Sequence, residues 1–310
     1  MIEVEALKKY FSSGILRKRH IKAVDGVSFQ IERGETLGLV GESGCGKTTI
    51  GRLLLRLIEP TSGKIIFDGI DLLQLKKKEL RRLRPRMQMI FQDPDASLNP
   101  RIKIGNSIAE PLKLQGDLNK VEIKNKVSEL IETVGLNPEH VNRYSYQLSG
   151  GQNQRVVLAR VLAVNPDFII ADEPTSSLDV SVQAQILNLM QDLKREFNLT
   201  LLFISHDLEV VRHMSDRIAV MYQGKIVELG NTKDIFEDAR HPYTNTLISP
   251  ASTGEQVISD GNRGMRNASD YPSGCVFYPR CSFCTEICSK KEPEMVEIGR
   301  GHQVLCHCIT

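Results

Sequence analysis

The chain has 310 residues, 41% of them hydrophobic, and a formal net charge of only +2. This length suits one large domain with an appendage or two modest domains, and the balanced charge argues against nucleic acid as the main partner, which would favour a concentrated excess of Lys and Arg. No apolar run approaches the ~18 residues of a membrane-spanning helix, and the start of the chain lacks the pattern of a signal peptide, so we expect a soluble cytoplasmic protein.

The first elements expected along the chain are two antiparallel strands, at residues 2–7 and 24–31, on either side of a basic loop at 17–20. The apolar run 37–40 predicts another strand, and residues 49–57 predict a helix. Between these two elements lies a full match to the phosphate-binding loop G-x-x-x-x-G-K-[ST]. The residues of this loop are Gly41, Glu42, Ser43, Gly44, Cys45, Gly46, Lys47 and Thr48.

Strand, glycine-rich loop and helix follow one another in the order that nucleotide binding needs. The glycines let backbone N–H groups and the helix N-terminus face an anion, Lys47 would reach the outer phosphates of ATP or GTP, and Thr48 would ligate Mg²⁺. Thr49, at the start of the helix, counts among the expected nucleotide contacts. Cys45 is open to two interpretations: a reactive thiol whose pKa the helix N-terminus lowers, or a small residue that fits the loop.

Short strands are predicted next, at residues 64–67 and 88–91, the second ending at Gln92. Between them, the basic run 76–86 predicts a solvated helix and turn, with anionic lipid head groups as an alternative partner.

A helical pattern occupies residues 105–164 and is clearest at 121–134, with interruptions expected at Pro111 and Pro138. We interpret this stretch as a helical subdomain inserted into an α/β core.

The continuous apolar runs 167–172 and 200–205 are typical of parallel strands covered on both faces, and residues 181–197 predict the crossover helix between them. Residues 217–222 and 225–229 predict a hairpin. Because the composition then turns polar, we expect a first domain at 1–250, a linker at 251–273 and a small module at 274–310.

Two carboxylates, Asp172 and Glu173, end a predicted buried strand. They could cap a helix, but beside a phosphate loop Asp172 can hold a water of the Mg²⁺ shell and Glu173 can act as the general base. His206 and Gln92 also follow strands, where α/β sheets place ligand-binding groups. His206 suits a contact to the γ-phosphate, and Gln92 could sense the metal and the attacking water. The alternatives are a structural histidine and an ordinary polar loop residue.

Together these motifs resemble the ATP-binding cassette family, the ATPase subunits of ABC transporters, over residues 1–250. The resemblance depends on the order of the phosphate loop, Gln92, and the segments 148–152, 168–173 and 177–179, followed by His206. It implies a P-loop NTPase fold with a RecA-like parallel core, an antiparallel β subdomain and the inserted helical subdomain.

The family also implies a head-to-tail dimer, in which Ser149, Gly151 and Gln152 of one cassette close over the nucleotide bound by the phosphate loop of the other. Asp179 corresponds to the loop that connects the two sites. Phe11 would stack on adenine, with Tyr10 as the alternative.

Three stretches, at 92–101, 178–185 and 241–244, are similar to the dipeptide/oligopeptide and nickel importer branch, and the insertion at 14–20 to its second, F-type ATPase. This implies a peripheral subunit on the cytoplasmic face of the membrane that hydrolyses ATP. Its partners would be a homologous ATPase or a second copy of itself, two permease subunits and, indirectly, a solute-binding protein. Nickel import, a soluble ABC protein without a transport role and an iron–sulfur electron-transfer protein are the alternatives.

Six of the seven cysteines lie in the expected C-terminal module. The spacing C-x5-C-x6-C-x17-C resembles the branch's C-terminal motif and implies that a [4Fe–4S] cluster is bound by Cys275, Cys281, Cys288 and Cys306. Zinc is the alternative metal, because Cys281 and Cys284 have a zinc-like spacing, and disulfides or inert thiols are the remaining possibilities. Cys284 and Cys308 leave the ligand set open.

Overall fold

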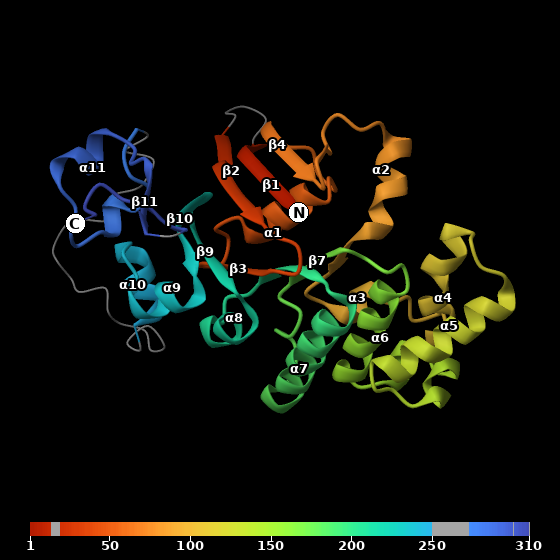
Figure 1. Cartoon of the computed structure of the whole chain (residues 1–310). Helices are drawn as coiled ribbons and strands as arrows, with labels where there is room; N and C mark the ends of the chain where they lie inside the picture. The colour runs from red at the N-terminus through yellow and green to blue at the C-terminus, as the bar shows by residue number, and fades with distance from the viewer. Residues whose placement is uncertain (14–18, 250–272, 300, 310) are drawn as a thin grey trace. The chain divides into compact units, whose positions relative to one another are not determined.

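The structure is a computed structural model that describes residues 1–13, 19–249, 273–299 and 301–309. The chain divides into two compact units (Figure 1). The first unit comprises Met1–Gln30, Leu37–Asp71 and Ser205–Thr310, and the second comprises Ile31–Thr36 and Leu72–Ile204. The expected linker at 251–273 lies outside the described residues except for its last position.

The first unit contains a four-stranded antiparallel sheet in the order β2-β1-β4-β5. Its strands are β1 (Ile2–Ser13), β2 (Arg19–Ile31), β4 (Ser62–Phe67) and β5 (Ile70–Asp71). Alternate apolar side chains on β1 and β4 are buried, among them Ile2, Val4 and Ile65, as expected when one face of a strand packs on a core. The three strands predicted from sequence in this region are confirmed, and both N-terminal strands are longer than predicted.

A second group of strands in the first unit runs in the order β11-β12-β10-β9-β3. These strands are β3 (Thr36–Val40), β9 (Arg217–Tyr222), β10 (Lys225–Asn231), β11 (Met295–Gly299) and β12 (His302–Leu305). β3 and β9 are parallel, whereas β9 and β10 form the predicted hairpin. Its turn requires positive φ angles, 42° at Gln223 and 85° at Gly224, which match the twist of a tight hairpin.

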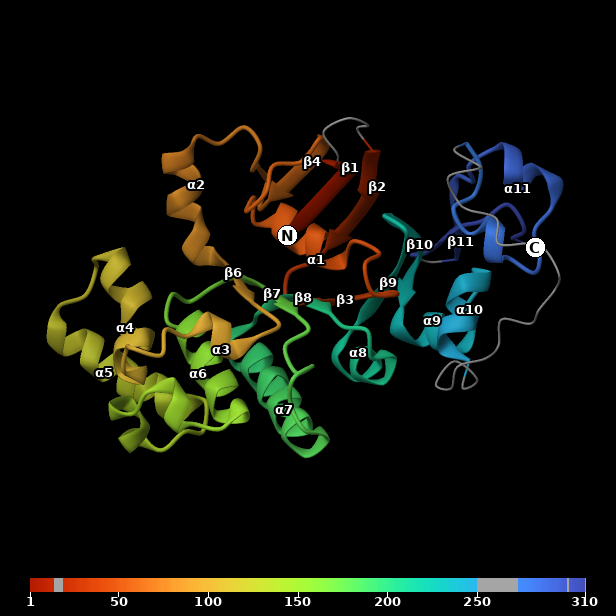
Figure 2. The same ribbon diagram turned by 180° about the vertical axis from the view of Figure 1, so that it is seen from behind.

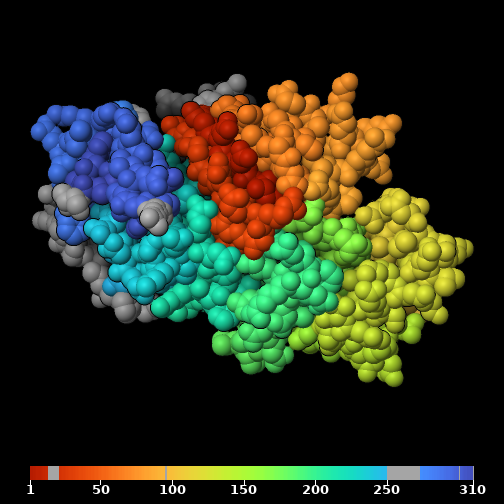
Figure 3. Space-filling model, viewed as in Figure 1, coloured from red at the N-terminus to blue at the C-terminus, as the bar shows by residue number. Residues whose placement is uncertain are grey.

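The helices of the first unit flank these strands (Figure 2). They are α1 (Lys47–Leu54), α8 (Leu208–Met214), α9 (Thr232–Glu237), α10 (Pro242–Ile248) and α11 (Glu286–Lys290), with a 3₁₀ turn at Tyr278–Arg280. We call residues 273–309 the C-terminal module. In Figure 3 this module, in blue, lies against the cyan residues of α9 and α10.

The second unit has three parallel strands in the order β8-β7-β6: β6 (Met87–Ile90), β7 (Phe168–Asp172) and β8 (Thr200–Ile204). Helix α7 (Val180–Phe197) is the crossover between β7 and β8, as predicted. The remaining helices are α2 (Lys77–Leu83), α3 (Pro94–Ser97), α4 (Ile104–Gln115), α5 (Lys120–Thr133) and α6 (Gly150–Leu162), with 3₁₀ turns at Arg84–Arg86, Pro138–Asn142 and Ser145–Gln147.

Two predictions of helix boundaries were wrong. Pro111 does not interrupt a helix but lies inside α4. This helix buries Ile108 and Leu112 and contacts α5 and α6, so tertiary contacts offset the one backbone hydrogen bond that proline cannot donate. Helix α1 ends at Leu54, three residues before the predicted end at 57, because Arg56 adopts a positive φ of 47°. Within the described residues, no helix is both long and apolar enough to cross a membrane.

Candidate functional site

The phosphate loop connects β3 to α1 in the first unit and can be formed only with glycine at two positions. Gly41 has a φ of 149° and Gly46 a φ of 114°, a region that L side chains rarely adopt. A Cβ atom on Gly41 would lie 2.1 Å from the carbonyl oxygen of Met221, and one on Gly46 would lie 2.1 Å from that of Ala23. The loop is therefore held directly against the backbone of β2 and β9.

The loop closes around the ammonium group of Lys47. This side chain is only 6% exposed, and its Nζ donates hydrogen bonds to the carbonyl oxygens of Gly41 at 2.6 Å and Glu42 at 3.1 Å. Thr48 and Thr49 follow in the first turn of α1 and are half-buried. The predicted cation and the predicted Mg²⁺ ligand thus both lie at the N-terminal end of α1, where backbone N–H groups favour an anion.

The surroundings of Cys45 decide between the two interpretations of this residue, a reactive thiol of lowered pKa or a small residue that fits the loop. The thiol is buried, with 7% exposure, and this burial raises its pKa even though the Lys47 charge acts in the opposite direction. A reactive thiol of lowered pKa was therefore the wrong interpretation, and a small residue that fits the loop agrees with the structure. Ser43 and Gly44, in contrast, are exposed at the tip of the loop.

Two residues that the sequence did not assign to the loop contact it at Glu42. The hydroxyl of Tyr243 accepts the backbone N–H of Glu42 at 3.0 Å. Nη1 of Arg280 donates to both carboxylate oxygens of Glu42, at 2.9 and 3.0 Å. Tyr243 lies in the stretch 241–244 that is similar to the importer branch, and Arg280 precedes Cys281 of the cysteine motif. These residues are 201 and 238 positions away from Glu42 along the chain, and no pattern in the sequence links residues so far apart.

The two aromatic residues proposed for adenine differ in their surroundings. The hydroxyl of Tyr10 donates to Asp25, and burial together with this carboxylate raises the pKa of Tyr10 to about 12. The ring of Phe11 is 41% exposed, and Nζ of Lys9 lies 5.0 Å from its centroid. Phe11 is therefore the more accessible ring, and its stacking on adenine stays a prediction.

In the second unit the structure brings together two of the predicted catalytic residues, Glu173 and Gln92. Asp172 is the last residue of β7 and is 5% exposed. Glu173 follows it with a φ of 48°, and its N–H donates to the carbonyl oxygen of Ile204 at 2.9 Å. Its carboxylate accepts a hydrogen bond of 3.1 Å from Nε2 of Gln92, which follows the adjacent strand β6. A strained backbone at a carboxylate is a feature that functional sites often retain.

The segment 148–152, which we call the signature segment, leads into helix α6 in the second unit. Ser149 is the N-cap residue and accepts the N–H of Gln152 at 3.3 Å, while the Gln152 side chain accepts the N–H of Ser149 at 3.0 Å. This reciprocal capping box accounts for both residue types. A Cβ atom on Gly151 would lie 2.4 Å from Cγ1 of Val182, so glycine is needed where α6 crosses α7. Asp179 is the exposed N-cap residue of α7.

His206, the histidine predicted to contact the γ-phosphate, lies two residues after β8 and is exposed. It precedes Asp207, whose side chain caps helix α8 by accepting the N–H groups of Glu209 and Val210. Its contact with a γ-phosphate stays a prediction.

None of the six cysteines of the C-terminal module forms a disulfide within the described part of the chain. Burial raises the pKa values of Cys275 and Cys281 to about 11, and the nearby Cys306 thiol adds to both shifts. The hydroxyl of Thr285 lies 3.4 Å from Sγ of Cys288 and 3.9 Å from Sγ of Cys308. Among the residues that the structure describes, no group of three or more His, Cys, Asp or Glu side chains is arranged to hold a metal ion.

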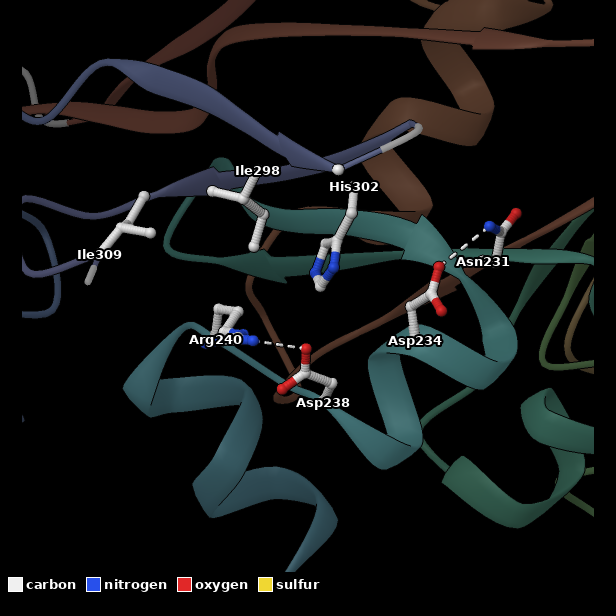
Figure 4. A pocket seen from close by; sticks show the side chains of 8 residues that line it. Asn231, Asp234, Asp238, Arg240, Ile298, His302 and Ile309 are labelled. Carbon is white, nitrogen blue, oxygen red and sulfur yellow. Dashed lines mark hydrogen bonds and ion pairs between the residues drawn. The ribbon is translucent and has the colours of Figure 1, made fainter.

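A cavity of about 530 Å³ lies where the C-terminal module meets α9 and the start of α10 (Figure 4). Its polar residues interact with one another: Asn231 donates to Asp234 at 3.0 Å, and Arg240 pairs with Asp238 at 2.7 Å. His302 from β12 also lines it, and we assign no ligand to this cavity.

Comparison with protein families finds two matches along the chain. A family model described as ABC transporter matches residues 24–176, and one described as Oligopeptide/dipeptide transporter, C-terminal region, matches residues 227–288. The chain is also 47% identical over 320 residues to the oligopeptide transport ATP-binding protein AppF of Bacillus subtilis (strain 168), with 99% of this chain and 97% of AppF covered.

Two solved structures of ABC proteins are also similar to this chain. The ATP-binding cassette MJ0796, a dimer in a post-hydrolysis state bound to ADP and Pi, is similar with a TM-score of 0.68 and 30% identity, covering 75% of this chain and 99% of MJ0796. The structure of cbiO1 from Clostridium perfringens, part of an ABC transporter complex, is similar with a TM-score of 0.67 and 28% identity, covering 81% of this chain and 96% of cbiO1.

Proposed function

The chain belongs to the ABC transporter family of ATP-binding proteins, and we propose that it is the ATPase subunit that energises import of dipeptides or oligopeptides through partner permease subunits. The observation that carries this proposal is the 47% identity to AppF over nearly the whole of both chains. The match of residues 227–288 to the C-terminal region of oligopeptide/dipeptide transporters supports the peptide branch. The subunit would act as a peripheral protein at the cytoplasmic face of the membrane.

The proposed hydrolysis needs residues that bind the phosphates and Mg²⁺ and residues that activate the attacking water. Lys47 and the N–H groups at the start of α1 would bind the phosphates, and Thr48 would ligate Mg²⁺. Asp172 would hold a water of the metal shell, Glu173 would take the proton of the attacking water, and Gln92 would orient that water. The hydrogen bond between Gln92 and Glu173 supports these last two roles because it fixes the carboxylate that acts as base. His206 would contact the γ-phosphate.

We further propose that hydrolysis takes place in a head-to-tail dimer, with a second copy of this chain or with a homologous ATPase. The likeness to the dimeric MJ0796 supports this assembly. Ser149 and Gly151 lie at the N-terminal end of α6, where the helix dipole and the backbone N–H groups of the first turn would favour the γ-phosphate bound by the other subunit. ATP binding would favour the closed dimer, and hydrolysis would release it.

The substitution Glu173→Gln tests the catalytic assignment. It removes the base but keeps a side chain that can pair with Gln92, so we expect ATP to bind as before, while hydrolysis falls at least ~100-fold and a dimer accumulates with ATP. Radiolabelled phosphate release and size-exclusion chromatography measure these effects. Hydrolysis at the normal rate in this variant would show that Glu173 is not the base.

Peptide import is tested separately with the assembled transporter. The chain would be purified with its permease subunits in liposomes, and uptake of labelled dipeptides, oligopeptides and nickel would be compared. Uptake of peptide supports the proposal, whereas uptake of nickel alone assigns the chain to the nickel branch. ATP hydrolysis without any associated permease would favour the soluble, non-transport alternative.

We also propose a metal centre in the C-terminal module, a [4Fe–4S] cluster with Cys275, Cys281, Cys288 and Cys306 as ligands, and zinc as the alternative. Four partly or fully buried thiols in 32 residues are a donor set that suits either metal. Such a metal would stabilise a module that has few apolar residues. Iron and acid-labile sulfide in equal amounts, with absorption in the visible region, are expected for the protein purified without oxygen. Stoichiometric zinc without iron would show that the site binds zinc. If the protein contained neither metal, the cysteines would be inert thiols.

A further inference from the structure

The C-terminal module contacts the phosphate loop directly. Arg280 lies in its first turn and makes two hydrogen bonds to the Glu42 carboxylate, 238 residues earlier in the chain. Each carboxylate oxygen lies within 3.0 Å of Nη1. The contact therefore joins a residue of the phosphate loop to a part of the chain that follows all of the family's nucleotide-binding motifs.

The guanidinium of Arg280 is held in place by aromatic rings. It lies 5.7 Å from the ring centroid of Tyr222 and 5.9 Å from that of Phe277, distances at which a cation is attracted to a ring face. The ring centroids of Tyr222 and Phe277 are 5.2 Å apart, and those of Tyr222 and Tyr243 are 4.6 Å apart. The cluster thus connects the module, strand β9 and helix α10, and it carries both groups that contact Glu42.

A second chain of interactions leads from the module to the strand that carries Phe11. Glu292 of the module pairs with Lys225 at 2.5 Å, and Lys225 lies 3.4 Å from Asp25. Asp25 in turn accepts the hydroxyl of Tyr10. The module therefore contacts the rest of the first unit at the phosphate loop and also at Tyr10, the residue before the exposed ring proposed for adenine.

We propose that Arg280, together with Tyr243, is a positioning residue for the phosphate loop, so that the C-terminal module is part of the ATP site. This inference rests on the proposed function. Tyr243 fixes the backbone N–H at the first variable position of the loop, and Arg280 fixes the side chain of the same residue, so the loop is ordered before the nucleotide arrives. Arg280 also neutralises Glu42, a carboxylate that would otherwise repel the anionic phosphates of ATP.

The size of the expected effect follows from the exposure of the pair. The Arg280 and Glu42 side chains are 40% and 45% exposed, so solvent weakens their attraction. We therefore expect a change of about threefold to fivefold in the affinity for ATP rather than a loss of binding.

The test compares ATP binding and hydrolysis by the full chain assembled with its partner subunits. Arg280→Ala should raise the KM for ATP and the Kd of a fluorescent ATP analogue about threefold to fivefold, while kcat changes less than about twofold. Arg280→Lys should recover part of the affinity, because it restores the charge but not the two-bond geometry. In the double variant Glu42→Gln with Arg280→Ala, the KM should return toward the original value, because no carboxylate is left unpaired.

A matched control comes from the same module. Lys290 pairs with Glu286 on α11, and both side chains are exposed, so Lys290→Ala removes an ion pair of the module without touching the loop and should leave the KM unchanged. If Arg280→Ala does not fold, Tyr243→Phe gives an independent test, because it removes the acceptor of the Glu42 N–H and keeps the ring; the same rise in KM is expected.

Two results would overturn the proposal: an unchanged KM in Arg280→Ala, whether or not kcat and the melting temperature fall, or an equal rise in KM in Lys290→Ala. Failure of the unaltered protein to bind ATP would instead contradict the proposed function itself, so the two failures are distinguishable.

Discussion

At the scale of single residues, burial determines the charge of His241. This ring is 1% exposed, its Nδ1 accepts the N–H of Tyr243 at 3.1 Å, and desolvation lowers the pKa of His241 to about 4. The histidine is therefore neutral at pH 7 and serves as the N-cap residue of α10, the helix that places Tyr243 beside the phosphate loop. Cys45 obeys the same rule, since burial outweighs the helix N-terminus from which a lowered pKa was predicted.

The low pKa of His241 predicts a pH dependence of stability. Unfolding returns the ring to water, where its pKa is about 6.5, so the unfolded chain binds an extra proton between about pH 6.5 and pH 4. The corresponding stability is present above about pH 6.5 and is lost as pH falls toward 4, by up to about 3 kcal/mol.

Urea unfolding at several pH values, on the original chain and on His241→Asn, measures this effect. Asparagine keeps an acceptor for the helix N-cap but does not titrate, so the free energy of unfolding should fall less steeply with acidity in the variant. Parallel curves for the two proteins would show that His241 is not the group responsible.

At the scale of elements, the contact between α6 and α7 explains a glycine that the family resemblance assigned to nucleotide binding. Gly151 lies in the first turn of α6, and the space that its missing Cβ leaves is filled by Val182, in the first turn of α7. Gly150, one residue earlier, has more room, because a Cβ there would lie 3.2 Å from Leu178. The signature segment therefore combines a helix N-terminus with a close crossing of two helices.

Gly151→Ala should destabilise the second unit by about 1–3 kcal/mol, because overpacking outweighs the small gain in helix propensity that alanine brings. Adding Val182→Ala should recover more than half of this loss, because it removes the atom that a Cβ at position 151 would meet at 2.4 Å. Denaturant unfolding followed by circular dichroism measures both variants. Gly150→Ala is the control, with a smaller expected change, and additive losses in the double variant would contradict this account of the contact.

At the scale of the whole chain, local sequence patterns predicted the elements, and contacts between distant segments escaped them. The β9–β10 hairpin, the crossover helix α7 and the phosphate loop follow from hydrophobic runs, turn residues and a motif, all of which depend on neighbouring residues. Tyr243 of α10 and Arg280 of the 3₁₀ turn Tyr278–Arg280 contact the loop across long stretches of chain, and no periodicity encodes such contacts. The sequence also did not predict how the C-terminal module packs on the rest of the first unit.

A buried hydrogen bond between Glu228 and His302 joins the module to the rest of the first unit. Glu228 of β10 is fully buried and accepts the N–H groups of Arg240 at 2.7 Å and His241 at 3.0 Å, and one of its oxygens lies 2.8 Å from Nε2 of His302. In the same region Glu228 pairs with Val304 across strands β10 and β12. The last strand of the module therefore continues the sheet whose strand β3 leads into the phosphate loop.

From this hydrogen bond we predict that the module and the rest of the first unit unfold together. His302→Ala would leave the Glu228 carboxylate buried without its side-chain partner, so the free energy of unfolding should fall by about 1–3 kcal/mol. The loss should be visible both in the unfolding of the sheet and in the exposure of the buried Cys288 thiol, at the same denaturant concentration. Lys233→Ala, which removes an exposed ion pair of α9 with Glu237, is the control and should change stability by less than about 0.5 kcal/mol. If His302→Ala exposed the thiol while the sheet unfolded as before, the module would be an independent unit, and it could not order the phosphate loop through Arg280.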